Sequence, residues 1–317
     1  MSLISLIIPS YNEEDNIQNT VDKLTELLSK QSFDYELIFV NDGSKDKTYE
    51  MIEEASKKDS HVKGISFSRN FGKEAAIFAG LEVATGAACV VIDCDLQHPP
   101  KLIPEMVEKW EEGYEVVEGV KSDRGKEGIF HKLAANTFYR IMSSLIKIDM
   151  RSTSDYKLLD RKVVDVLLDL PEHNTFFRAL SFWVGFKSIK LEYEVEERQF
   201  GTTKWSLGSL IRYAINNATS FSTAPLQIVT FFGVVSIIFS VILGIQTLVK
   251  FFMGTAKEGF PTVILLQLLI GGFIMLSLGI IGHYIARIYE EVKGRPRYII
   301  KEHTGNILGN IDGKKVN

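Results

Sequence analysis

The chain has 317 residues and a formal net charge of −4. This length provides a sizeable buried core without disulfides or metal staples. The charge balance argues against a general nucleic-acid binder, which normally carries a basic excess. The two cysteines, Cys89 and Cys94, fall in one predicted strand at an odd spacing. They should face opposite sides of a sheet and remain unpaired, which fits a reduced, cytoplasmic compartment.

The N-terminal part of the chain alternates strand and helix patterns. Its first residues lack the basic start and cleavage site of a signal peptide, and they predict a core strand. A helix is predicted at 16–28. The predicted strands are 3–8, 35–40, 62–66 and 88–92. This alternation predicts a mostly parallel sheet with helices on both faces, in which ligands bind beyond the carboxyl ends of the strands.

Two long stretches, 225–249 and 260–286, contain no Asp, Glu, Lys or Arg. Each can cross about 30 Å of hydrocarbon at about 1.5 Å per residue, so we predict two transmembrane helices in an antiparallel hairpin. Lys and Arg are more frequent on the flanks than in the connecting loop, and this bias places the preceding domain in the cytoplasm. The expected organisation is a cytoplasmic domain at 1–222, the hairpin at 223–287 and a cytoplasmic basic tail at 288–317. A buried helical hairpin of a soluble protein is the alternative.

Two segments before the hairpin have an amphipathic pattern. Residues 129–148 place apolar side chains near one helical face, and residues 207–221 show a weaker form of the same pattern. Both could lie on the membrane surface, although such a stripe also suits ordinary core packing.

A pair of carboxylates, Asp93 and Asp95, follows the fourth predicted strand, just before two prolines that force a turn. Alternate residues of an extended segment project to the same side, so Asp95 can ligate a cation while Asp93 contacts ribose or the same ion. Oxygen ligands suit Mg²⁺ or Mn²⁺ bridging a diphosphate. Gln97 offers a further carbonyl ligand, whereas His98 is expected to be a hydrogen-bonding neighbour. A solvated turn with capping aspartates would also explain the pattern.

Polar motifs after the first two strands suit a nucleoside. The motif Ile8-Pro9-Ser10-Tyr11-Asn12-Glu13-Glu14 offers an aromatic ring for stacking, and Asp42 in Val40-Asn41-Asp42-Gly43-Ser44 can accept hydrogen bonds from a base or ribose. A helix N-cap and a simple turn are the alternatives. The motif Arg69-Asn70-Phe71-Gly72-Lys73-Glu74-Ala75-Ala76 begins a helix, where the N-terminus and basic side chains favour a phosphate.

These motifs, in this order, resemble those of family 2 glycosyltransferases. Two later motifs, Ser154-Asp155-Tyr156-Lys157-Leu158-Leu159 and Glu197-Arg198-Gln199-Phe200-Gly201-Thr202-Thr203-Lys204-Trp205, narrow the resemblance. With the hairpin, they make residues 3–300 similar to bacterial polyprenyl-phosphate glycosyltransferases related to dolichyl-phosphate mannose synthase. That group more often has phenylalanine where this chain has Tyr156. The Gln-x-x-Arg-Trp signature of processive polysaccharide synthases does not occur in the sequence, which argues against polymer synthesis.

The resemblance implies a GT-A fold and inverting transfer of a hexose from a UDP-sugar to undecaprenyl phosphate. Glucose and N-acetylglucosamine are favoured over mannose from GDP-mannose. It also implies a Mg²⁺ or Mn²⁺ cofactor, contact with membrane lipid, a homo-oligomer and a role in cell-envelope glycosylation. A non-catalytic scaffold of the same fold, or a transferase using another lipid or a protein acceptor, are the competing functions.

The lipid phosphate has a second pKa of about 6, so the attacking oxygen is already largely ionised. Asp155 therefore either positions the acceptor or removes a residual proton. Arg198 and Lys204 are expected to stabilise the leaving diphosphate, or else to form a basic cluster attracted to anionic lipid. The expected site comprises Pro9, Tyr11, Glu13, Asp42, Lys73 and Asp93 for the nucleotide, Asp95 and Gln97 for the metal, and Asp155, Arg198 and Lys204 for catalysis.

Overall fold

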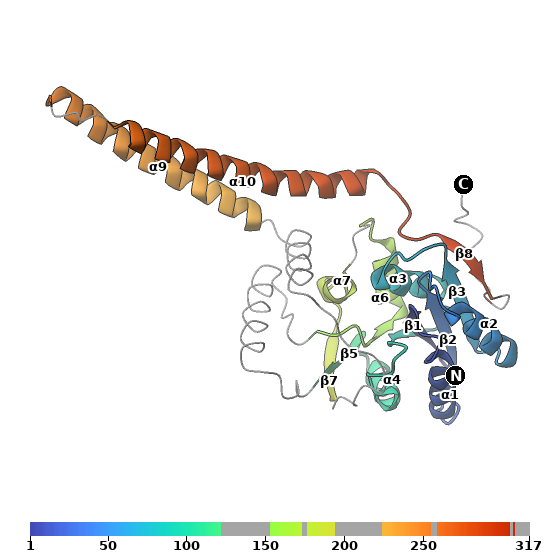
Figure 1. Ribbon diagram of the computed structural model, residues 1–317. Coiled ribbons are helices and arrows are strands. Elements are labelled where there is room, and N and C mark those ends of the chain that lie inside the picture. The colour runs from blue at the N-terminus through green and yellow to red at the C-terminus, as the bar shows by residue number, and fades with distance from the viewer. Residues whose placement is uncertain (122–152, 173–175, 194–223, 255–258, 305–306, 308–317) are drawn as a thin grey trace, which may run out of the picture. The chain divides into compact units, whose positions relative to one another are not determined.

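The computed structural model of the chain describes residues 1–121, 153–172, 176–193, 224–254, 259–304 and 307. The chain forms two compact units, one built on a sheet and the other on two long helices (Figure 1).

In the described residues, one eight-stranded sheet has the order β7-β5-β6-β4-β1-β2-β3-β8. Strands β1 to β4 are mutually parallel where they pair, β5 pairs parallel with β7, and β6 and β8 are antiparallel to their neighbours. The strands are β1 Leu3–Ser10, β2 Asp34–Asn41, β3 Val62–Phe67, β4 Ala88–Val91, β5 Val116–Lys121, β6 Lys157–Asp160, β7 Ser188–Tyr193 and β8 Ile300–His303. The predicted mostly parallel sheet is confirmed.

Helices pack on both faces of the sheet, as the alternation predicted. Helix α1 presents Ile17, Val21, Leu24 and Leu28, spaced by three or four residues, to the same core as Ile4 and Leu6 of β1. Helix α3 covers the opposite face and approaches so closely that a Cβ on Gly80 would lie 2.2 Å from the Ile7 side chain. The helices of this unit are α1 Ile17–Leu28, α2 Thr48–Lys58, α3 Lys73–Val83, α4 Ile103–Glu111, α6 Arg161–Asp169 and α7 Phe177–Trp183, with a 3-10 turn at Pro100–Leu102.

Both cysteines are buried and free, but the structural premise for that expectation was wrong. Strand β4 ends at Val91, so Cys94 lies in the following turn and not in the strand with Cys89. The turn begins there because the chain must leave the sheet before Pro99 and Pro100.

Helices α9 Ala224–Phe252 and α10 Phe260–Val292 form the second unit. Each contains a span that is long and apolar enough to cross a membrane, Val229–Phe252 and Leu266–Val292. None of either apolar window is buried inside the chain, which disfavours the buried-hairpin alternative. Phe232 of α9 stacks on Phe273 of α10 with ring centroids 5.5 Å apart, so the two helices pack on each other.

The tail after the hairpin contributes to the sheet. The sequence predicts a separate basic segment at 288–317, but α10 continues to Val292 and residues Ile300–His303 form β8, antiparallel to β3. The apolar stretch marks where a helix can lie in hydrocarbon, whereas the helix itself continues while its backbone hydrogen bonds remain favourable.

Candidate active site

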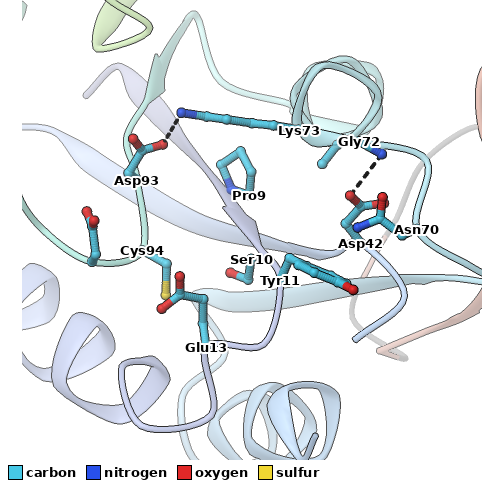
Figure 2. Close-up of a pocket in the computed structure, with 12 residues that line it drawn as sticks. Pro9, Ser10, Tyr11, Glu13, Asp42, Asn70, Gly72, Lys73, Asp93 and Cys94 are labelled. Atoms are coloured by element: carbon cyan, nitrogen blue, oxygen red, sulfur yellow. Dashed lines mark hydrogen bonds and ion pairs between the residues drawn. The ribbon is translucent and has the colours of Figure 1, made fainter. Parts of the chain in front are cut away.

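A cavity of about 300 Å³ opens at the carboxyl ends of β1, β2 and β4 (Figure 2). Its lining comes from four loops that are distant in sequence. Seven of the eleven predicted site residues line this one cavity, so the structure brings them together. The lining residues are Pro9, Ser10, Tyr11, Glu13, Asp42, Asn70, Gly72, Lys73, Ala76, Asp93, Cys94 and Asp95.

The loops after β1 and β2 hold each other in place. The Asn12 backbone N–H donates to Ser44 Oγ at 2.9 Å, and the Lys45 N–H donates to Asn12 Oδ1 at 3.0 Å. Asn12 has a φ of 55°, a left-handed conformation that asparagine tolerates well. The helix-cap and turn interpretations of these motifs are thus compatible with a binding role, because the same turns place Tyr11 and Glu13 at the cavity.

Asp42 holds the loop that precedes α3. Its carboxylate accepts backbone N–H groups from Phe71 at 2.6 Å and Gly72 at 2.9 Å. Figure 2 shows the Gly72 contact at the edge of the cavity. Gly43 must be glycine here, since it has a φ of 62° and a Cβ would lie 2.3 Å from the Arg69 carbonyl carbon. Asp42 therefore shapes the cavity wall in addition to facing it.

Asp93 and Asp95 lie in a tight turn, as the following prolines and the turn alternative indicated, and not on an extended segment. The Leu96 N–H donates to the Asp93 carbonyl at 3.2 Å, and Leu96 has a φ of 49°. Asp95 Oδ1 accepts the Gln97 N–H at 3.1 Å. Helix α1 also holds the turn, because the Thr20 hydroxyl donates a hydrogen bond to the Cys94 carbonyl at 2.7 Å.

Lys73 joins two carboxylates that are far apart in sequence. Its Nζ lies 2.5 Å from Asp93 Oδ1 and 3.0 Å from Asp155 Oδ2. Burial lowers the pKa of Lys73, but the two carboxylates outweigh burial and raise it above its ordinary value. Burial also raises the pKa of Asp93, and Lys73 and His98 outweigh that effect, so Asp93 stays ionised. The cation and both anions are therefore charged at neutral pH.

Arg178 of α7 completes this cluster and was not among the predicted site residues. Its Nε and Nη2 donate to the two oxygens of Asp155 at 2.6 and 2.8 Å, a bidentate pair. Burial raises the pKa of Asp155, but Arg178 and Lys73 outweigh burial and lower this pKa to about 2. The one sequence signal for Arg178 was a charge within the otherwise apolar run from Phe176 to Leu180.

Glu74, next to Lys73, links α3 to α7. Its Oε2 accepts the Phe177 N–H at 2.8 Å, which places the first turn of α7 and therefore Arg178. Burial and the nearby Asp155 raise the pKa of Glu74 to about 7.

An aromatic layer supports the Asp93 turn. His98 Nε2 lies 3.6 Å from Asp93 Oδ2, and its Nδ1 hydrogen-bonds the Tyr193 hydroxyl, which agrees with the expected hydrogen-bonding role. Tyr156 stacks on His98 with centroids 5.2 Å apart, and its hydroxyl donates to the Pro99 carbonyl at 3.0 Å. The hydroxyl that distinguishes Tyr156 from phenylalanine thus holds the end of the turn.

The donor atoms available for a cation are few. Among the described residues, no group of three or more His, Cys, Asp or Glu side chains could hold a metal ion. Asp93 is paired with Lys73, whereas no cationic side chain of the described residues forms an ion pair with Asp95. Mg²⁺ is commonly held by one or two carboxylates together with substrate phosphates. These residues fit a cation that arrives with a diphosphate.

The remaining predicted residues differ in their placement. Asp155 joins the cavity through Lys73, and Gln97 contributes a backbone contact to Asp95. Arg198 and Lys204, together with the amphipathic segments 129–148 and 207–221, lie outside the described residues.

A family profile described as Glycosyl transferase family 2 matches residues 5–186. The chain belongs to this family. The resemblance seen in its motifs is confirmed, and the sheet unit also includes β7 and β8, which lie outside the matched residues.

Its relatives match over nearly their whole length. The glycosyltransferase YkcC of Bacillus subtilis is 45% identical over 303 residues, which cover 95% of this chain and 94% of YkcC. The SfII prophage-derived bactoprenol glucosyl transferase of Shigella flexneri is 38% identical over 96% of this chain and 99% of its own.

A solved structure confirms the expected GT-A-type fold. Glucosyl-3-phosphoglycerate synthase from Mycobacterium tuberculosis, crystallised with Mg²⁺ and UDP, superposes with a TM-score of 0.52. It is 21% identical, and the match covers 70% of this chain and 79% of the synthase.

Proposed function

We propose that this glycosyltransferase moves a hexose, glucose in the first place, from a UDP-sugar to undecaprenyl phosphate at the cytoplasmic face of the membrane. The observation that carries the proposal is the charged cavity lined by Lys73, Asp93 and Asp95, with Asp155 paired to Lys73, in a chain that also has two helices able to span a membrane. The bactoprenol glucosyl transferases, which match almost end to end, favour glucose and a polyprenyl acceptor.

The donor would occupy the cavity at the strand ends. Pro9, Tyr11, Glu13 and Asp42 surround the space proposed for the nucleoside. Asp95, with Gln97, would hold Mg²⁺ or Mn²⁺ against the diphosphate, and the bound cation supplies stabilisation of negative charge there. Lys73 neutralises Asp93, which reduces repulsion between that carboxylate and an incoming diphosphate.

Asp155 is assigned a positioning role. Its two oxygens accept N–H donors from Arg178 and Lys73, and a carboxylate whose pKa is about 2 is a weak proton acceptor at neutral pH. The acceptor phosphate is largely ionised without help. Asp155 therefore orients the two cations, whose charge favours the approach of a phosphate, and alignment of the phosphate oxygen with the anomeric carbon supplies the rate.

Arg198 and Lys204 are proposed to stabilise charge on the leaving diphosphate, with inversion at the anomeric carbon. The lipid-linked sugar would serve cell-envelope glycosylation. A homo-oligomer remains part of this proposal.

One experiment distinguishes the proposed function from its two competitors, a non-catalytic scaffold and a transferase that uses another acceptor. The detergent-solubilised chain is incubated with undecaprenyl phosphate, Mg²⁺ or Mn²⁺, and one donor at a time. The donors are UDP-glucose, UDP-N-acetylglucosamine and GDP-mannose. The mass of the lipid product is measured by mass spectrometry. We expect a product one hexose heavier than undecaprenyl phosphate with UDP-glucose. The Asp95→Asn variant and excess chelator should abolish it, and Asp165→Asn, a change on exposed α6 surface, should not.

If no mixture shows sugar transfer or donor hydrolysis, the result would support a non-catalytic scaffold and refute the proposal. Donor hydrolysis without a lipid product would support another acceptor, such as a different lipid or a protein.

A further inference from the structure

The segment 296–304, which we call the C-terminal strap, lies along the sheet unit. The residues that it contacts there are far from it in the sequence. In Figure 1 its strand β8 lies beside β3, at the opposite end of the sheet order from β7. Ile65 pairs with His303 and Ser66 with Glu302. The strap is therefore joined to the strand that leads into the Arg69–Gly72 loop of the cavity.

Both ends of the strap are fastened. At one end, Thr304 is buried, donates its N–H to the Gly64 carbonyl at 2.9 Å and accepts the Gly64 N–H on its hydroxyl at 2.9 Å. At the other end, Arg297 donates to the carbonyls of Leu170 and Glu172 at 2.5 Å, and Leu170 is the C-cap of α6. Capping helix carbonyls with an arginine is stabilising.

The middle of the strap contacts the base of the cavity loop. The Ser68 N–H donates to the Ile299 carbonyl at 3.0 Å. Tyr298 stacks on Phe67 with centroids 5.0 Å apart and an interplanar angle of 12°, and its hydroxyl hydrogen-bonds Glu82. Phe67 in turn makes an edge contact with Phe71, at 5.7 Å.

The loop is held mainly through its backbone and its aromatic rings. Ser68, Arg69 and Asn70 are exposed, so hydrogen bonds, ring contacts and the close approach of the Arg69 backbone to Gly43 fix their path. Asp42 binds the far end of the loop through Phe71 and Gly72, and the strap binds the near end through Ser68 and Phe67.

We propose that the strap, through Tyr298, positions the Arg69–Gly72 wall of the cavity and thereby sets the affinity for the nucleotide sugar. Tyr298 is a positioning residue, since it lines no part of the cavity. The strap follows α10 directly along the chain, so residues beyond the apolar hairpin complete a site formed by residues before it. The effect of the strap on donor affinity rests on the proposed function, whereas its effect on the conformation of the loop does not.

The test uses the full chain in detergent and two measurements. Hydrogen exchange of peptides covering Ser68–Gly72 reports the loop without requiring activity. Steady-state kinetics report KM for the donor separately from kcat. Tyr298→Ala should speed exchange in the loop, leave a β1 peptide unchanged and raise donor KM roughly tenfold with kcat within about twofold, the scale of one lost aromatic pair.

Matched variants complete the design. Tyr298→Phe keeps the stack on Phe67 and should restore loop protection and donor KM to near wild type. Lys301→Ala, on the exposed side of the same strap, should change neither. If Tyr298→Ala loses structure throughout, Tyr298→Leu, which keeps apolar volume and removes the ring stack, decides the question by the same criteria.

Unchanged loop exchange in the folded alanine or leucine variant would overturn the inference and leave the strap as a cover for the β3 edge. Faster loop exchange with unchanged donor KM would overturn its affinity part. A chain inactive with every donor would count against the proposed function, while the exchange data would still decide the positioning.

Discussion

Replacing Asp155 with asparagine tests the proposed role of the buried charge cluster. The change keeps the shape of the side chain but removes the charge that Arg178 and Lys73 share, and the new amide NH₂ must face one of two N–H donors. The folded-state pKa of about 2, against an ordinary 3.8, corresponds to about 2 to 3 kcal/mol of stabilisation at roughly 1.4 kcal/mol per unit. Asp155→Asn should lower the free energy of unfolding by about that amount at pH 7.

The pH dependence of this loss has a definite sign. Because the pKa of Asp155 is lower in the folded chain than in the unfolded chain, its stabilisation is complete above about pH 4 and disappears as the pH falls toward 2. Thermal unfolding of the solubilised wild type and variant should therefore differ by a constant amount from pH 7 to about 5. The two melting temperatures should converge at more acidic pH.

A matched control is Asp165→Asn, whose exposed pair with Arg161 spans 3.8 Å and should contribute little. Turnover of Asp155→Asn should fall by about 10²-fold or more, the scale of losing an aligned electrostatic group. A variant as stable as the wild type at pH 7, or a stability difference that persists unchanged at pH 3, would refute this account of the cluster.

Four further outcomes are expected. Asp95→Asn should abolish transfer and leave the melting temperature near wild type, and wild-type turnover in excess chelator would contradict the metal assignment. Lys204→Ala should reduce turnover by about 10²-fold while the chain stays in the membrane fraction; an unchanged rate at saturating substrates would place this lysine in a lipid-binding patch. Cysteine-accessibility labelling should find residues 250–259 outside the cell and a cysteine at His303 inside, and reversed labelling would overturn the topology. Tyr156→Phe should destabilise the fold by about 1 kcal/mol through loss of one buried hydrogen bond, and an unchanged unfolding midpoint in denaturant would show that bond to be unimportant.

Much of the fold could be predicted because its signals are local. The period-2 and buried patterns of β1 to β4, the spacing of Ile17, Val21, Leu24 and Leu28 in α1, and the two uncharged stretches each depend on residues close together in sequence. The rule that parallel strands present their carboxyl ends at one edge was then sufficient to group Tyr11, Asp42 and Asp95.

Local patterns could not reveal which distant segments meet. Strand β6 enters the sheet between β4 and β5, and this insertion brings Asp155 to Lys73, a pairing of residues 82 positions apart. Arg178 and Tyr298 were missed for the same reason, since each contacts a partner that only the tertiary packing places beside it.

The amino-acid sequence by itself thus determined the elements of this protein, the strand ends that carry its polar motifs and the apolar hairpin. Only the tertiary structure decided that Asp93 pairs with Lys73, that Asp155 is bound on both oxygens, and that the C-terminal strap closes the β3 edge. The physical reason is range: propensity and hydrophobic period act over a few residues, whereas charge pairing and edge-strand addition depend on the order in which strands assemble.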